Sequence, residues 1–221
     1  MTIKKAIEKF NSVAHQAQTL TFLPRDQALQ TGALDAVTAS LQEMSLIKTA
    51  FISEKNEDAA NQTLSLELAL SSLASEIRMH LALKNGLPEK SWDHLVDAQH
   101  YAAAAMRAHP SASNLHAHLA KLEAVERLLF PPQTFMSIGA IVGLAECSIC
   151  GKEYDECTHI MGRPYMGQMC GVICKNVQIQ EVSFVTDPAD KKCRVTHFTE
   201  SGGRRNKMTW KLEKNEVGHE S

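Results

Sequence analysis

All six cysteines of this 221-residue chain lie between residues 147 and 193, and the first 146 residues contain none. They are Cys147, Cys150, Cys157, Cys170, Cys174 and Cys193. Small secreted scaffolds spread their cysteines along the whole domain, whereas thiols clustered in one part of a chain that has no secretory signal are typically metal ligands. The sequence therefore predicts a cytoplasmic protein with one localised metal site in its C-terminal half.

The segment 147–151 reads CSICG, a spacing typical of a zinc knuckle. The tight turn aims two sulfur atoms at one point, and the glycine lets backbone amides approach them. Zn²⁺ takes four nitrogen or sulfur ligands at the corners of a tetrahedron, so two more are needed. We predict that Zn²⁺ is bound by Cys147, Cys150, Cys157 and His159, with Cys170 as the substitute for either Cys157 or His159.

Four protein ligands fill the coordination sphere of zinc, so the predicted site is structural rather than catalytic. The ion would stabilise a loop-rich segment that is too small to fold on a core of its own. One alternative is a set of thiols without metal, and another is a redox pair at Cys147 and Cys150. Redox C-x2-C motifs normally begin a helix in a βαβ unit, and no such pattern surrounds residue 147.

The first 130 residues are predicted to form an antiparallel bundle of helices. Only two of the eleven glycines precede residue 131, and apolar residues recur there at helical spacing. The expected helices cover residues 26–52 with a break at 43–45, residues 56–84 capped by Asn56 or Asp58, residues 88–109, and a last helix capped by Asn114 that runs to 129. Short connections favour antiparallel neighbours.

Beyond Pro131 and Pro132 the pattern changes to short β-branched or apolar runs between turn residues. Strands are expected over residues 135–144, 178–186 and 193–198, around the cysteine-rich insertion. The fold class is thus α+β, with a helical bundle at 1–130, a small β-rich zinc-binding module at 131–200 and a flexible basic tail at 201–221.

The net charge of −2 gives no overall field that would attract nucleic acid or an anionic membrane. No run approaches the roughly 18 apolar residues that span a bilayer, so no membrane contact is expected. A nucleic-acid-binding zinc protein stays as one alternative. Its local cations would be Arg163, Lys175, Lys191, Lys192 and those of the tail.

Three short segments resemble the closing part of phage prohead proteases, which act in capsid maturation. They are Ser137-Ile138-Gly139, residues 181–190 (EVSFVTDPAD) and Cys193-Arg194-Val195, and the match covers about residues 134–198. The resemblance implies that Ser137 occupies the position of the nucleophile and that the cysteine segment is a zinc-bearing insertion. The catalytic histidine of that family belongs to an upstream β-rich half, which is here replaced by the predicted helices.

These observations favour a non-enzymatic zinc-binding interaction or assembly protein of phage or prophage-related origin. The helical bundle is expected to contact a protein partner or a second copy of the chain, in the host cytoplasm or in a virion. The alternative from another class is a prohead-type serine protease that uses Ser137. The bundle histidines His94, His100, His116 and His118 show no arrangement that would serve such a serine.

Overall fold

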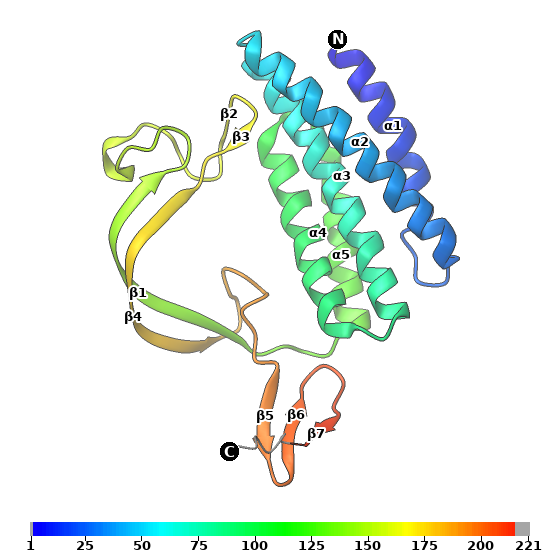
Figure 1. Ribbon diagram of the computed structural model, residues 1–221, viewed down its shortest axis with the longest axis vertical. Coiled ribbons are helices and arrows are strands. Elements are labelled where there is room, and N and C mark those ends of the chain that lie inside the picture. The colour runs from blue at the N-terminus through cyan, green and yellow to red at the C-terminus, as the bar shows by residue number, and fades with distance from the viewer. Residues whose placement is uncertain (1, 215–221) are drawn as a thin grey trace, which may run out of the picture.

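The computed structural model describes residues 2–214, which form five α-helices followed by small antiparallel sheets (Figure 1). This confirms the predicted α+β class. The helical elements are α1 (Ile3–Gln18), α2 (Gln27–Ser53), α3 (Glu57–Lys84), α4 (Pro88–Ala108), the 3-10 helix η1 (Pro110–Leu115) and α5 (His116–Leu129). Among these residues no helix is both long and apolar enough to cross a bilayer.

Local signals set most helix boundaries. The Asp26 side chain accepts a hydrogen bond from the Leu29 amide at 3.0 Å, and Asn56 accepts one from the Ala59 amide at 3.1 Å. Such contacts satisfy amides that have no partner within the first turn. Pro88 begins α4 as expected, because the first helical position needs no amide hydrogen.

Two details of the predicted helices are wrong. Helix α2 runs without a break through residues 43–45, because Met44 is fully buried and holds that turn in the core. Asn114 does not cap the last helix. Pro110 starts a 3-10 turn that is capped at the Ser111 amide by the His109 ring, and Asn114 lies inside that turn.

Helix α3 lies at the centre of the bundle and contributes to both of its larger apolar clusters. One cluster joins it to α1 and α2 around Val37, Met44 and Leu70. The other joins it to α4 and α5 around Trp92 and Leu122. The second cluster also takes in two residues from beyond the helices, Phe130 and Phe135, so the core of the bundle continues into the start of the β-rich half.

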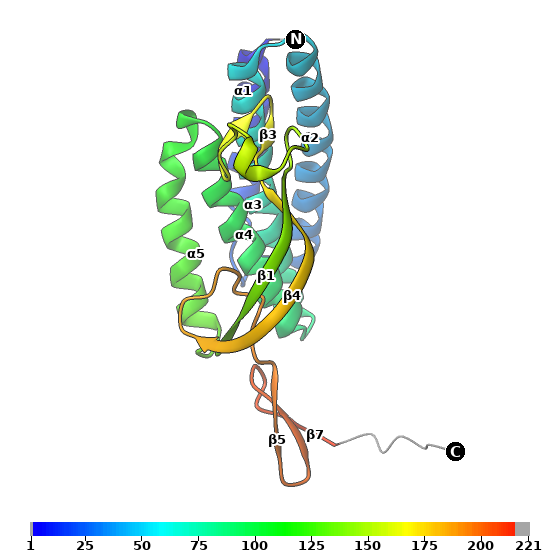
Figure 2. The same cartoon turned by 90° about the vertical axis from the view of Figure 1, so that its left-hand side faces the viewer.

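The β-rich half is built on a long antiparallel ribbon of β1 (Phe135–Cys147) and β4 (Val172–Val185), which curves beside the helices (Figures 1 and 2). Both strands are longer than predicted, since β4 begins six residues earlier, with Val172 opposite Cys147. The short elements η2 (Tyr154–Glu156), β2 (Pro164–Tyr165) and β3 (Gln168–Met169) lie between the two strands. A bulge interrupts the ribbon at Gly139 and Ala140.

The base of the ribbon is fixed to the bundle through Trp92. This side chain is 1% exposed and packs against Phe130 and Phe135, with ring centroids 5.4 and 6.2 Å away. Its indole Nε1 donates to the Lys191 carbonyl at 3.0 Å. Arg194 covers the same ring and forms an ion pair with Glu89 of α4.

The prediction of a flexible tail is wrong for residues 201–214. They form β6 (Gly203–Asn206) and β7 (Leu212–Glu213), which pair with β5 (His197–Glu200) in a three-stranded sheet. Arg205 forms an ion pair with Glu200, and Asn206 donates to Glu89 at 3.0 Å. These contacts neutralise a basic side chain of the segment and attach the sheet to α4. Residues 215–221 of the predicted tail lie outside the described residues.

Candidate metal centre

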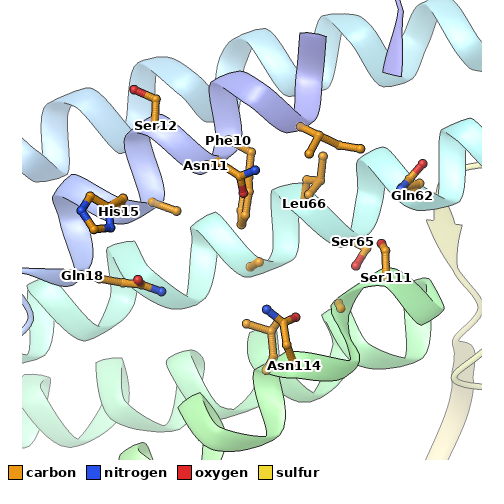
Figure 3. Close-up of a pocket in the computed structure, with 15 residues that line it drawn as sticks. Phe10, Asn11, Ser12, His15, Gln18, Gln62, Ser65, Leu66, Ser111 and Asn114 are labelled. Carbon is orange, nitrogen blue, oxygen red and sulfur yellow. The ribbon is translucent and has the colours of Figure 1, made fainter. Parts of the chain in front are cut away.

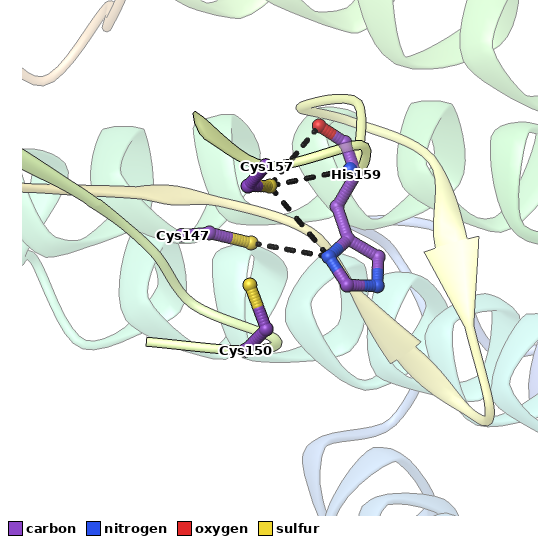
Figure 4. A group of neighbouring side chains, drawn as sticks. All are labelled: Cys147, Cys150, Cys157 and His159. Atoms are coloured by element: carbon purple, nitrogen blue, oxygen red, sulfur yellow. Dashed lines mark hydrogen bonds between the residues drawn. The ribbon is translucent and has the colours of Figure 1, made fainter. Parts of the chain in front are cut away.

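The far end of the ribbon brings four of the predicted ligands together (Figure 4). Cys147 is the last residue of β1, Cys150 lies in the turn that follows, and Cys157 and His159 lie just after η2. Their ligand atoms all lie within 4.8 Å of one another. The His159 Nδ1 atom is 3.6 Å from the Sγ atoms of both Cys147 and Cys157. This arrangement could hold a metal ion.

Backbone amides support the sulfur atoms. The Ile149 amide lies 3.4 Å from the Cys147 Sγ, and the His159 amide lies 3.2 Å from the Cys157 Sγ. The turn closes with a 2.9 Å hydrogen bond from the Gly151 amide to the Cys147 carbonyl, with Gly151 at φ 69°. A side chain at that φ would be strained, which explains the glycine after the second cysteine.

Two tyrosines hold the loop that carries His159. The Tyr165 ring packs edge-on against the imidazole, with centroids 4.6 Å apart, and its hydroxyl accepts from the Ile160 amide at 2.9 Å. The Tyr154 hydroxyl accepts from the Met161 amide, also at 2.9 Å. The orientation of the imidazole is therefore fixed by its surroundings, as is typical of metal-ligating histidines.

The thiols have very different proton affinities. Burial alone would raise the pKa of Cys147, but hydrogen bonds from the Cys150 and Ile149 amides and from neighbouring thiols lower it to about 6. Burial and the adjacent sulfurs of Cys147 and Cys150 raise the pKa of Cys157 to about 11, against an opposing His159 amide. One thiolate thus discourages the next from ionising, and a bound cation would remove that repulsion.

The remaining cysteines fall into two groups. Cys170 is 3% exposed and its Sγ lies 3.8 Å from the Cys147 Sγ, so it borders the cluster from the β4 side. Burial and the Cys147 sulfur raise its pKa. Cys174 and Cys193 are exposed, and neither joins a group of three or more metal-ligating side chains in the part of the chain that the structure describes.

Residues 147–171, which we name the cysteine-rich module, rest on the helices through the β2–β3 hairpin. At its tip the Gly167 amide donates to the Asn61 side chain at 2.8 Å, and the Met166 amide donates to Glu57 at 3.2 Å. Gly167 has φ 76°, and a Cβ atom there would lie 3.0 Å from the Lys48 Cγ. The hairpin therefore fits closely against α2 and α3 because residue 167 has no side chain.

Replacing Gly167 by valine is expected to lower the free energy of unfolding by about 2–4 kcal/mol, since strain at positive φ and crowding at the helix surface add together. Gly162→Val is the matched control, because Gly162 has φ 80° but its nearest neighbour outside the turn, Arg107, is 3.9 Å from the added Cβ. Urea unfolding of both variants measures the difference. An equal loss of unfolding free energy in the two variants would show that a side chain at residue 167 does not crowd the helices.

No family model, curated protein or solved structure matches this chain.

Ser137, the residue at the position of the protease nucleophile, lies exposed in β1 opposite Ser183 of β4. Within residues 2–214 no histidine side chain is hydrogen-bonded to it. A serine nucleophile needs a base in hydrogen-bond reach to take its proton. Among the described residues, the structure therefore does not bring Ser137 together with a histidine base.

A pocket of about 680 Å³ lies between α1, α3 and η1 (Figure 3). Its lining is mainly apolar, amide and hydroxyl side chains, among them Phe10, Asn11, Ser65 and Asn114. His15 is the one titratable side chain among the lining residues. A single imidazole with no carboxylate or thiol beside it is not a constellation for nucleophilic or acid–base chemistry.

The bundle interior contains a polar network that the sequence analysis missed. The Ser72 hydroxyl is 2.9 Å from His118 Nε2, and His118 Nδ1 is 3.9 Å from the Glu76 carboxylate. Lys121 Nζ lies 2.7 Å from the same carboxylate. Ser72 and Glu76 are both 0% exposed, and the serine donates to the Ala98 carbonyl, so substrate has no access to this group.

Burial shifts the titration of this network. Desolvation raises the pKa of Glu76, opposed by the charge of Lys121. Desolvation and the same lysine lower the pKa of His118 to about 4 and that of His80, one turn beyond Glu76 on α3, also to about 4. The sequence does contain a signal for this network. Ser72, Glu76 and His80 follow one another at intervals of four residues, which places them on one face of α3.

Proposed function

We propose that this protein is a non-enzymatic zinc-binding interaction protein of phage or prophage-related origin, which acts in an assembly in the host cytoplasm or in a virion. The observation that carries the proposal is the Cys147, Cys150, Cys157 and His159 cluster. Zn–S bonds of about 2.3 Å and Zn–N bonds of about 2.0–2.1 Å put sulfur and nitrogen about 3.6 Å apart at the corners of a tetrahedron. His159 Nδ1 has that separation from two sulfurs.

The chemistry of the ligands supports zinc and a structural role. Three thiolates and an imidazole suit zinc, whereas Mg²⁺ and Ca²⁺ prefer oxygen ligands. Four protein ligands leave no open position for water or substrate. The segment around them contains two buried cysteines and little other apolar core, so a metal ion would supply much of the energy that holds its shape.

The alternatives from other classes lack a comparable observation. The protease hypothesis would need a histidine beside Ser137. The nucleic-acid hypothesis would need free cations, but three of the four proposed lysines and arginines outside the tail are paired with carboxylates. These pairs are Lys175–Glu146 at 2.6 Å, Lys191–Glu126 at 2.7 Å and Lys192–Asp97 at 2.6 Å.

Metal analysis of the purified protein tests the proposal. We expect one zinc per chain, lost in Cys150→Ser and retained in Cys174→Ser, since Cys174 is an exposed cysteine of the same half that lies outside the cluster. Cys170→Ser is expected to retain the ion because the other four ligands remain. Zinc loss in Cys170→Ser with retention in Cys157→Ser would instead assign Cys170 as a ligand, and absence of zinc from the unaltered protein would refute the proposal.

A further inference from the structure

The two faces of the β1–β4 ribbon differ in polarity. Its register places ten apolar residues on one face: Met136, Ile138, Ala140, Val142 and Leu144 from β1, and Ile173, Val177, Ile179, Val182 and Phe184 from β4. We name these ten residues the apolar ribbon face. Seven of them are large and strongly exposed, with Ile179 at 63% and Phe184 at 76%.

The opposite face carries mainly polar or small residues, including Ser137, Gln178, Glu181 and Ser183, with Ile141 as its exposed large aliphatic. At the base of the ribbon this polar face presents Phe135 to Trp92 of the bundle. At the base of the ribbon, the apolar ribbon face therefore lies on the side away from that contact. Figure 2 shows the ribbon in front of the helices with no other element covering its middle.

Such a surface is unusual for a protein that works alone. Monomeric proteins rarely expose a contiguous apolar patch larger than about 300–600 Å². The seven exposed side chains together present on the order of 700 Å², at about 100 Å² for each. Exposed leucines of the bundle, such as Leu29, Leu46 and Leu128, lie instead on separate helices or turns. A two-stranded ribbon is also marginally stable unless one face is covered.

We propose that the apolar ribbon face is the interface of a homodimer, in which the ribbons of two copies pack face to face about a twofold axis. Complete coverage of the seven side chains in both copies would bury about 1,400 Å², within the range of stable interfaces, which is about 1,200–2,000 Å². The charged residues on this face, Glu146 and Lys175, pair with each other at 2.6 Å near its end. Identical faces can therefore meet without like-charge repulsion, as a self-complementary interface requires.

This inference specifies the partner for the proposed interaction role and rests on that role, but the observations behind it do not include the metal site. It also moves the partner surface from the helical bundle, where the sequence analysis placed it, to the ribbon. Two stacked ribbons would pack as the sheets of a β-sandwich do, about 10 Å apart.

Sedimentation velocity at micromolar concentrations tests the dimer. The unaltered 24.4 kDa chain is expected to sediment as a dimer. Ile179→Lys is expected to raise the dissociation constant about a hundredfold or more, because each copy would bury a charge without a partner. Gln178→Lys is the matched control: it adds the same charge one residue away, on the polar face, and is expected to leave the dimer intact.

Two outcomes would contradict the inference. A monomeric unaltered protein would overturn the dimer, and equal weakening by Gln178→Lys would overturn the assignment of the face. Zinc content and helical circular dichroism measured on the same samples separate the two proposals. A folded monomer that contains zinc would refute the dimer alone, whereas a dimer without zinc would refute the metal site alone.

Discussion

Removing the proposed zinc ion is expected to unfold the cysteine-rich module and to leave the helical bundle folded. The four proposed ligands bring the turn at residues 147–151 together with the loop at 157–159. Structural zinc typically contributes about 10–16 kcal/mol of binding free energy, which is lost as folding energy when the ion is removed. The bundle has its own apolar clusters, in which α3 is largely buried, and needs no metal for them.

Hydrogen exchange with and without a strong chelator measures this effect. Amides of residues 147–171 should lose their protection, including the Gly167 amide that bonds to Asn61, while amides within α3 should keep theirs. Added Zn²⁺ should restore protection and Mg²⁺ should not, because Mg²⁺ prefers oxygen ligands. Unchanged exchange in chelator would show that the module holds its shape without the ion.

Acid is expected to destabilise the bundle by several kcal/mol through His80 and His118. The folded state keeps the pKa of each near 4, whereas in the unfolded chain each has an ordinary value near 6.5. Between those values the unfolded state binds protons that the folded state excludes, so the free energy of unfolding falls as the pH falls. Each histidine contributes about 3 kcal/mol across the window, at about 1.4 kcal/mol per unit. The raised pKa of Glu76 works in the opposite direction, since its stabilisation is lost as the pH rises above 4.5.

Urea unfolding followed by helical circular dichroism, at neutral pH and near pH 4, measures this loss. His80→Leu should lose less stability on acidification than the unaltered protein, because it removes one of the two imidazoles whose pKa the fold lowers to about 4. His116→Leu, on the exposed side of α5, is the control and should lose as much as the unaltered protein. An unaltered acid response in His80→Leu would exclude His80 as a cause.

Features encoded by neighbouring residues could be predicted from the sequence. Asp26, Asn56 and Pro88 mark helix starts through contacts within one turn, so their positions follow from the chain alone. The knuckle at 147–151 is equally local, and it drew attention to Cys157 and His159 nearby. Four of the candidate ligands therefore came together in the structure as the spacing predicted.

Features that depend on distant partners were missed. Strand β4 starts at Val172 because that residue pairs with Cys147, although the sequence VICKNV contains polar residues typical of a loop. The sheet at residues 203–213 is ordered partly through Glu89, which is 117 residues from Asn206. The tip of the β2–β3 hairpin contacts α3 more than 100 residues away. The residue pattern within a single segment does not reveal contacts with residues so far away in the sequence.

The β1–β4 ribbon is fastened to the helices at both ends, by Phe135 on Trp92 and by the hairpin at Gly167. Its curvature is therefore set by the distance between two anchors, one of which belongs to the cysteine-rich module. Binding of an ion at the far anchor and binding of a second chain to the middle of the ribbon would then be thermodynamically coupled. By reciprocity, whatever factor zinc adds to the affinity between subunits, association must add to the affinity for zinc.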